Sequence, residues 1–247
     1  NLALFLEKRM LPKARIKPFV YAQIFSLLTT RQLFVRNKVS LNRKAYGVLI
    51  RNGIKVPKRR LDNRSGYERH VFCHELPEEV MFELNVIYAS VSNTLEQIKK
   101  IEAEIGDLCC EIDDYHIIRS IPGMGPVNSA VMLSVIIDAK DFKTFPQLAS
   151  YFGIVPRIRL SNDKKNTGKI TRRGSKLGRS ALVQSTWIAI QRSSYLKNYY
   201  ERQKINKGAA QKAIVATANK YLKIIYECMK DEILYENYVA QFEKKAE

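Results

Sequence analysis

The chain has 247 residues and is strongly basic, because 42 lysines and arginines against 24 acidic residues leave a formal net charge of +18 and a pI near 9.8. This excess makes a polyanion such as nucleic acid the natural partner. With 46% hydrophobic residues the chain can bury a core. It contains no run of 18 apolar residues, so we predict no membrane-spanning helix, and we expect no membrane among its partners.

The first residues predict the end of a helix. NLALFLEKR is amphipathic and contains no Met, so we expect residues 1–18 to be the end of an upstream domain whose last helix is closed by Pro12 and Pro18.

Two long helices are predicted next, over Phe19–Asn52 and Pro77–Ser120, separated by a turn-rich segment at 53–76. Lys8 to Arg60 holds 15 basic residues and no acid, whereas Asp62 to Arg119 holds 13 acidic and 5 basic residues. Opposite charges favour an antiparallel hairpin of the two helices.

The second helix carries an apolar seam with steps of three or four residues, which favours a coiled coil over residues 19–118. The seam consists of Met81, Leu84, Ile87, Val91, Leu95, Ile98, Ile101, Ile105, Leu108 and Ile112. It is compatible with pairing inside the chain, with a homo-oligomer through the coiled coil, or with burial in an ordinary bundle.

Residues 119–247 predict a compact helical domain. IPGMGP at 121–126 precedes an apolar helix at Val127–Ile137, which is typical of a helix-hairpin-helix motif. Gly123 and Gly125 would let the backbone approach a phosphate, and the N–H groups of the following helix would point at the anion. A helix–helix turn without a ligand is the alternative. The expected fold class is therefore mainly α, a two-helix coiled coil followed by this domain.

A short helix at 146–153 leads into the most basic segment, which holds nine basic residues and one acid between Arg157 and Arg179. Ser161 lies here in a segment that we expect to be a polar, non-helical loop. We predict that the basic side chains bind a nucleic-acid backbone: Arg157, Arg159, Lys164, Lys165, Lys169, Arg172, Arg173, Lys176 and Arg179.

Ser175 is predicted to cap the next helix. We expect a core face of Leu182, Trp187, Ile188 and Ala189, and final helices at 208–230 and 231–244. Tyrosines at 195, 199 and 200 are expected mostly in the core, with stacking on bases as the alternative.

Two kinds of chemistry compete for this surface. The acid pairs Asp113 with Asp114 and Asp138 with Asp141 are the candidates for metal-dependent cleavage, but neither has the spacing of a metal site, and His70, Cys73 and His74 lack a fourth ligand. We therefore expect no metal site in this chain. Ser161 is the better candidate, because neighbouring cations would stabilise a pentavalent phosphoryl transition state. Such a serine is more often merely solvated.

The segment from IPGMGP through FPQLASYFGIVPR and the Ser161 region to GKITRRGSKLGRSAL resembles the C-terminal domain of DEDD-type, bridge-RNA-guided insertion-sequence transposases, which are related to pilin-gene invertases. The resemblance is close over residues 119–195 and looser over 19–118. The matching positions are Pro122, Gly123, Gly125, Phe145, Gly153, Pro156, Arg157, Ser161, Gly168, Ile170, Arg172, Arg173, Gly174 and Arg179. The glycine that usually follows the family's serine is replaced by Asn162.

This resemblance implies a transposase that cleaves and transfers DNA strands, with Ser161 as the nucleophile. It also implies DNA and a bridge RNA as partners, a prokaryotic cytoplasmic location, and Mg²⁺ held by acidic residues of an N-terminal RuvC-like domain outside this sequence, so that this chain alone would be inactive. The alternative is a non-catalytic helix-hairpin-helix module that binds DNA or RNA and assembles through a coiled coil.

Overall fold

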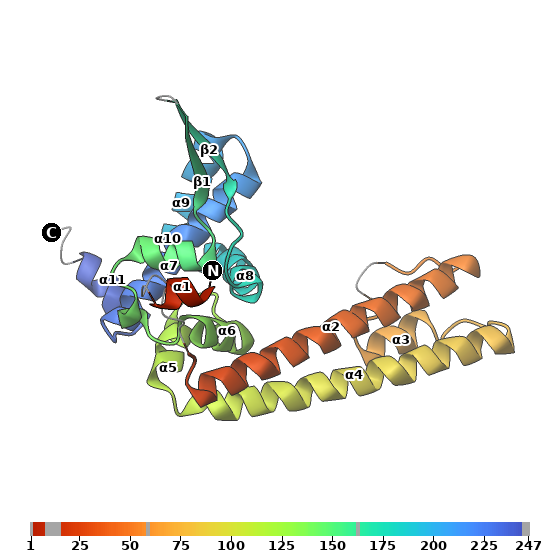
Figure 1. Cartoon of the computed structure of the whole chain (residues 1–247). Coiled ribbons are helices and arrows are strands. Elements are labelled where there is room, and N and C mark those ends of the chain that lie inside the picture. Colours follow the sequence, from red (N-terminus) through yellow and green to blue (C-terminus); the bar gives the residue numbers. More distant parts are fainter. Residues whose placement is uncertain (1, 8–15, 58–59, 162–163, 244–247) are drawn as a thin grey trace.

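The computed structural model describes residues 2–7, 16–57, 60–161 and 164–243. Within these residues helices dominate, with a single two-stranded sheet, so the mainly α fold class is confirmed. A long antiparallel helix pair projects from a compact helical domain (Figure 1). The first described element is the short helix α1 (Leu2–Glu7). No helix in the described part of the chain is long and apolar enough to cross a membrane.

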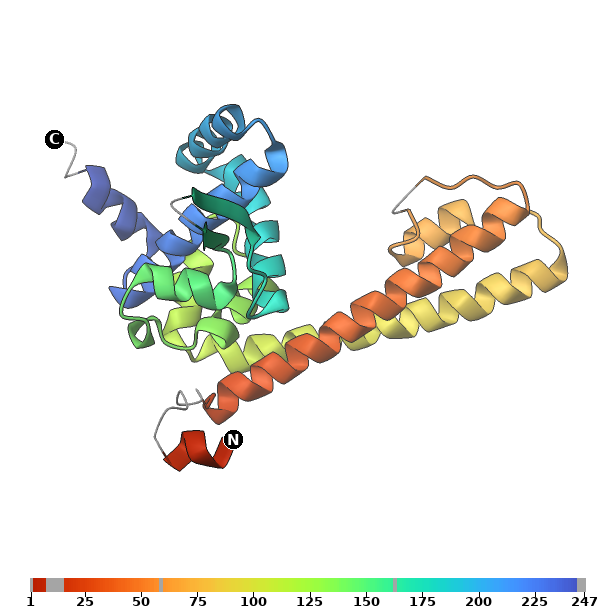
Figure 2. The same cartoon turned by 45° about the horizontal axis from the view of Figure 1, so that its top comes forward.

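The projecting pair consists of α2 (Phe19–Arg51) and α4 (Glu78–Cys110), which lie side by side along most of their length (Figure 2). Ion pairs join Arg31 to Glu102 at 2.6 Å and Lys44 to Glu83 at 2.8 Å, so the start of α2 lies beside the end of α4 and the two helices run antiparallel. The predicted hairpin between a basic and an acidic helix is therefore confirmed.

The apolar seam of α4 is used inside the chain. Leu84, Val91 and Ile105 on the seam are almost completely buried, and Ala45 and Leu49 of α2 belong to the same core as Leu84 and Val91. The seam is thus covered by α2 and by the elements around it, and these residues are not exposed for contact with a second subunit.

At the far end of the pair, the segment predicted to be irregular contains a helix, α3 (Arg64–His70). The side chain of Asn63 caps it by accepting a hydrogen bond from the N–H of Gly66 at 2.8 Å. The sequence did not predict this helix, because Asn63 and Gly66 are residues typical of turns. A helix of only two turns is stabilised by packing and not by its own propensity.

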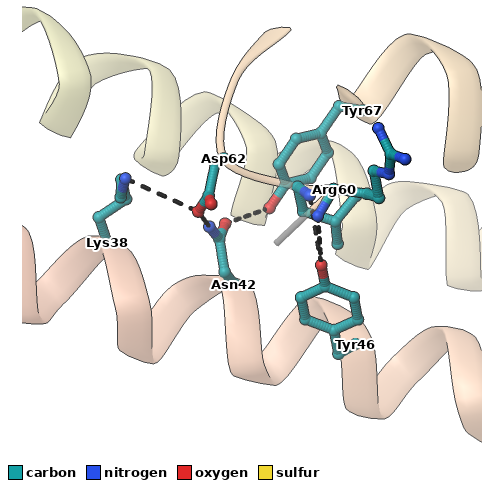
Figure 3. A network of polar contacts seen from close by, with 7 residues as sticks. Lys38, Asn42, Tyr46, Arg60, Asp62 and Tyr67 are labelled. Atoms are coloured by element: carbon teal, nitrogen blue, oxygen red, sulfur yellow. Dashed lines mark hydrogen bonds and ion pairs between the residues drawn. The ribbon is translucent and has the colours of Figure 1, made fainter. Parts of the chain in front are cut away.

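A polar network fastens this end to α2 (Figure 3). The Tyr67 hydroxyl donates to Asn42 Oδ1 at 2.9 Å, and Asn42 Nδ2 donates to Asp62 at 3.4 Å. The Tyr46 hydroxyl accepts from the backbone N–H of Arg60 at 2.9 Å. Buried Asn42 has its polar atoms satisfied, so the network holds the segment in one arrangement.

The second long helix ends earlier than predicted. α4 stops at Cys110, and α5 (Asp113–Ser120) begins after a break in which Ile112 has extended backbone angles (φ −106°, ψ 114°). The acidic residues Asp113 and Asp114 fill the first turn of α5, where negative charge is favoured by the helix dipole. The apolar periodicity continues through this break, so it does not reveal the change of direction.

The compact domain continues from α5 through α6 (Pro126–Ile136), a 3₁₀ turn η1 (Ala139–Asp141) and α7 (Phe145–Phe152) to strands β1 (Pro156–Ser161) and β2 (Lys164–Ile170). It ends with α8 (Lys176–Arg192), α9 (Ser194–Lys207), α10 (Ala210–Lys230) and α11 (Tyr235–Glu243).

Helix α10 is the centre of this domain, because it contacts α5, α7, α8 and α9, and its Tyr221, Leu222 and Ile225 are fully buried. Ile24 of α2 and Cys109 of α4 join the same core, so the near end of the helix pair is packed into the domain. Burial raises the pKa of the Cys109 thiol to about 11.

The predicted core face of α8 is half correct. Leu182 and Ala189 are buried, but Trp187 is 43% exposed and Ile188 is 40% exposed. Trp187 lies at the edge of α9, where its ring contacts that of Tyr200 with the centroids 5.6 Å apart. No helix was predicted over the residues of α9, and this helix decides which side of α8 is covered.

Candidate nucleic-acid interface

The basic segment forms a β-hairpin and not the predicted loop. β1 and β2 are antiparallel, with Ile158 paired with Thr167 and Ser161 paired with Lys164. The hairpin stands out from the rest of the domain (Figure 1). Alternation of Ile158 and Leu160 with polar residues, followed by two residues between the strands, is the sequence pattern of a hairpin and would have predicted it.

Ser161 is the last residue of β1 and is paired with Lys164, the first residue of β2. Its side chain lies outside the described residues, and so do those of Arg159, Lys164, Lys165 and Lys169. The structure therefore places the backbone of these predicted site residues on one hairpin.

The base of the hairpin is held by close backbone contacts. The N–H of Thr171 donates to the carbonyl of Val155 at 2.9 Å, and the N–H of Arg172 donates to the carbonyl of Gly153 at 3.1 Å. A Cβ on Gly153 would lie 1.8 Å from the carbonyl oxygen of Arg173, and one on Gly174 would lie 1.9 Å from the carbonyl oxygen of Tyr151. Only glycine fits at Gly153 and Gly174, because each is pressed against backbone and has a positive φ.

Arg179 locks this base from α8. Its Nη1 donates to the carbonyl oxygens of Phe152 at 3.0 Å and Arg173 at 3.1 Å. Burial lowers the pKa of its guanidinium from the ordinary value, and the charge of Arg172 lowers it further. Arg179 thus joins the two chain segments from which the hairpin rises. Its predicted contact with nucleic acid stays a prediction.

The exposed cations around the base are Arg157, Arg172, Arg173 and Lys176. None of them forms an ion pair with a carboxylate among the residues whose placement is described. Ser175 caps α8 as predicted, since its Oγ accepts from the N–H of Gly178 at 3.0 Å. These four exposed cations lie around the base of the hairpin and the first turn of α8.

The turn at 121–125 has a structural reason for its first glycine. Gly123 is buried with φ +92°, and a Cβ there would lie 2.5 Å from the carbonyl oxygen of Ser185 and 2.7 Å from the N atom of Ala189. The close contact with α8 accounts for a glycine at this position, and the predicted approach of Gly123 to a phosphate stays a prediction. Gly125 is partly exposed, has open space around it and precedes the first turn of α6.

Side chains hold this turn in place. The Tyr221 hydroxyl donates to the carbonyl of Pro122 at 2.7 Å, and Arg119 Nη1 donates to the carbonyl of Met124 at 2.8 Å. The two backbone oxygens are satisfied within the protein, as expected of a turn that joins two packed helices.

The candidate acid pairs, Asp113 with Asp114 and Asp138 with Asp141, lie in the described part of the chain. Among the described residues no three histidine, cysteine, aspartate or glutamate side chains are grouped to hold a metal ion. Asp138 accepts a hydrogen bond from the N–H of Lys140 at 2.7 Å and so caps the turn η1. Desolvation raises the pKa of Asp114, and the charge of Asp138 raises it further.

Comparison with known proteins shows similarity to transposases over the residues that carry this basic surface. Residues 115–201 match the family described as Transposase IS116/IS110/IS902 family. This match begins in α5 and ends within α9, so it includes the turn at 121–125, the hairpin, its base and all of α8.

The chain is also similar over a longer range to named transposases. It is 26% identical over 229 residues to the transposase for insertion sequence element IS1111A of Coxiella burnetii, which covers 85% of this chain and 59% of the relative. It is 25% identical over 175 residues to the transposase for insertion sequence element IS1328 of Yersinia enterocolitica, covering 69% and 51%.

A third relative, a probable family 20 transposase of Pseudomonas aeruginosa, is 26% identical over 155 residues, covering 57% of this chain and 44% of the relative. The chain spans about half the length of the curated relatives it matches. Its homologues are thus transposases of insertion sequences.

Proposed function

We propose that this chain is the part of a DEDD-type, bridge-RNA-guided transposase that grips DNA and supplies the nucleophile for strand cleavage and transfer. The observation that supports this most is that residues 115–201, which match a transposase family, include the base of the hairpin and its free cations. Exposed cations without carboxylate partners can neutralise the phosphates of a nucleic-acid backbone.

In the proposed reaction, the oxygen of Ser161 attacks the phosphorus of a DNA phosphodiester. A new P–O bond to the serine forms as the bond to a deoxyribose oxygen breaks, and the proton lost by the serine is balanced by the one gained by the departing hydroxyl. The phosphoserine ester keeps the free energy of the broken bond, so a hydroxyl of another strand can reverse the step without ATP. Nearby cations would stabilise the transition state.

Mg²⁺ does not fit the residues described in this structure, because no three possible ligands are grouped among them. We propose that acidic residues outside this sequence hold it, as the family resemblance implies. Accordingly, no step of the proposed reaction is assigned to a metal bound by this chain.

We also propose that the whole protein acts as a homo-oligomer. Because α2 covers the α4 seam, a contact between subunits would have to use other surfaces. Phe82 and Val86 on α4 are 70% and 52% exposed and one helical turn apart, which makes them the best candidates.

The test is to trap the covalent intermediate in the whole transposase with labelled DNA and to detect it on a denaturing gel. We expect an adduct with the natural sequence, none with Ser161→Ala, and an adduct with Ser175→Ala, which removes only a helix cap. DNA affinity should change little in both variants. An adduct with Ser161→Ala would reject the serine, whereas binding without an adduct in any variant would favour the non-catalytic module.

A further inference from the structure

Helix α9 carries a row of aromatic and basic side chains that is separate from the basic residues of the hairpin. Tyr195, Tyr199 and Arg202 follow one another at steps of four and three residues, so they lie along one side of the helix. Tyr195 is 53% exposed and Tyr199 is partly exposed, although both were expected mostly in the core. Tyr200 is the one that is buried.

Each of the two exposed rings has a cation beside it. The guanidinium carbon of Arg202 lies 5.4 Å from the ring centroid of Tyr199, and Nζ of Lys220, on α10, lies 5.7 Å from that of Tyr195. These distances lie within the range of a cation–π contact. The row therefore extends from α9 onto α10 through Lys220.

These two cations are free to accept an anion. The described ion pairs within α9 and α10 use Lys204 with Glu201 and Lys223 with Glu227. Neither Arg202 nor Lys220 pairs with a carboxylate in the part of the chain that the structure describes. A phosphate could therefore bind each cation without displacing an acidic side chain.

We propose that this face of α9 and α10 binds an unpaired DNA strand, with bases stacked on Tyr195 and Tyr199 and phosphates at Lys220 and Arg202. A ring next to a cation matches one nucleotide, which offers a base next to a phosphate. Residues one turn apart are separated by about 5.4 Å along a helix. Stacked nucleotides in a duplex strand rise by only about 3.4 Å, so a duplex cannot place successive bases on both rings.

This inference rests on the proposed function, and it extends the DNA-binding surface beyond the hairpin. In Figure 1, α9 and the hairpin both stand at the end of the compact domain away from α2 and α4. The hairpin base carries cations suited to a duplex backbone, whereas the α9–α10 face adds exposed rings suited to bases that have left the duplex.

The experiment measures binding of the chain to a labelled oligothymidylate of about 12 nucleotides, within the usual site size for a single strand, and to a duplex of the same length. Tyr195→Ala should weaken binding of the single strand roughly 5- to 150-fold, the range for removal of one base–aromatic stack, and should change duplex binding less than about twofold. Tyr195→Phe should bind like the natural protein because it keeps the ring.

Two lysines on these helices give a matched pair. Lys220→Ala should weaken single-strand binding, whereas Lys197→Ala should not, because Lys197 lies two residues from Tyr195 and therefore on the other side of α9. Circular dichroism of each variant checks that it is folded.

The outcomes separate this proposal from the proposed function. If Tyr195→Ala, Tyr199→Ala and Lys220→Ala bind the single strand normally while Arg172→Ala weakens the duplex, the α9–α10 site is wrong and the DNA-binding function stands. If no DNA is bound at all, both fail. Binding of oligouridylate more than tenfold tighter than oligothymidylate would overturn the choice of DNA.

Discussion

Replacing Gly153 by Ala tests whether the base of the hairpin is held by the close approach of two backbones. A Cβ at this position would lie 1.8 Å from the carbonyl oxygen of Arg173, whereas ordinary contacts begin at 3.4 Å, so one segment must move by about 1.6 Å. That movement breaks the hydrogen bond from Arg172 to Gly153 and strains the one from Thr171 to Val155.

Gly208 provides the matched control. It follows α9 as Gly153 follows α7, with φ +61° against +66°, but a Cβ there would meet nothing within 4 Å. Gly208→Ala should therefore lower the free energy of unfolding only by the cost of placing alanine in the left-handed backbone conformation, about 1–2 kcal/mol. Gly153→Ala adds the loss of one or two hydrogen bonds at about 0.5–1.5 kcal/mol each and the steric displacement, so we expect about 3–5 kcal/mol in total.

The assay is urea denaturation of the two variants and the natural chain, with hydrogen exchange at the amides of Thr171 and Arg172. Gly153→Ala should lower the denaturation midpoint more than Gly208→Ala and should speed exchange at both amides. Equal free energies of unfolding for the two variants, to within about 0.5 kcal/mol, would refute the close approach, because the two expected costs differ by at least about 1 kcal/mol.

Three further predictions address charge, pH and the far end of the helix pair. The double substitution Arg172→Ala and Arg173→Ala should reduce the slope of log K against log salt for duplex binding by about 1.8, or about 0.9 for each phosphate that is no longer neutralised; an unchanged slope would remove both arginines from the interface. Because desolvation raises the pKa of Asp114 in the folded state, the unfolded state loses this proton first as pH rises, and stability falls between the unfolded and folded pKa values. The change in denaturation midpoint caused by Asp114→Asn should therefore be more favourable at pH 7, where the folded wild type carries the penalty, than at pH 3. A less favourable change at pH 7 would contradict a pKa raised by desolvation. Tyr46→Phe removes the hydroxyl that accepts two backbone N–H groups, so those amides should exchange faster and stability should fall by about 1–2 kcal/mol, as measured by hydrogen exchange and urea denaturation.

The sequence by itself determined the features that depend on neighbours along the chain. The spacing of apolar residues located α2 and α4, and their opposite charges predicted the antiparallel pairing. Ser175 was recognised as a helix cap because its partner, the N–H of Gly178, is only three residues away. The concentration of basic residues between Arg157 and Arg179 likewise needed no structure to be seen.

Only the tertiary structure decided how distant segments meet. The hydrogen bond from Arg179 to the carbonyl of Phe152, 27 residues earlier, could not be predicted from neighbours along the chain. The packing of Gly123 against Ala189 on α8 was likewise hidden from the local pattern. Trp187 was assigned to the core because periodicity identifies an apolar face without showing whether another helix covers all of it. Local patterns report which conformations a segment prefers, but long-range packing determines which side chains remain free to bind a partner.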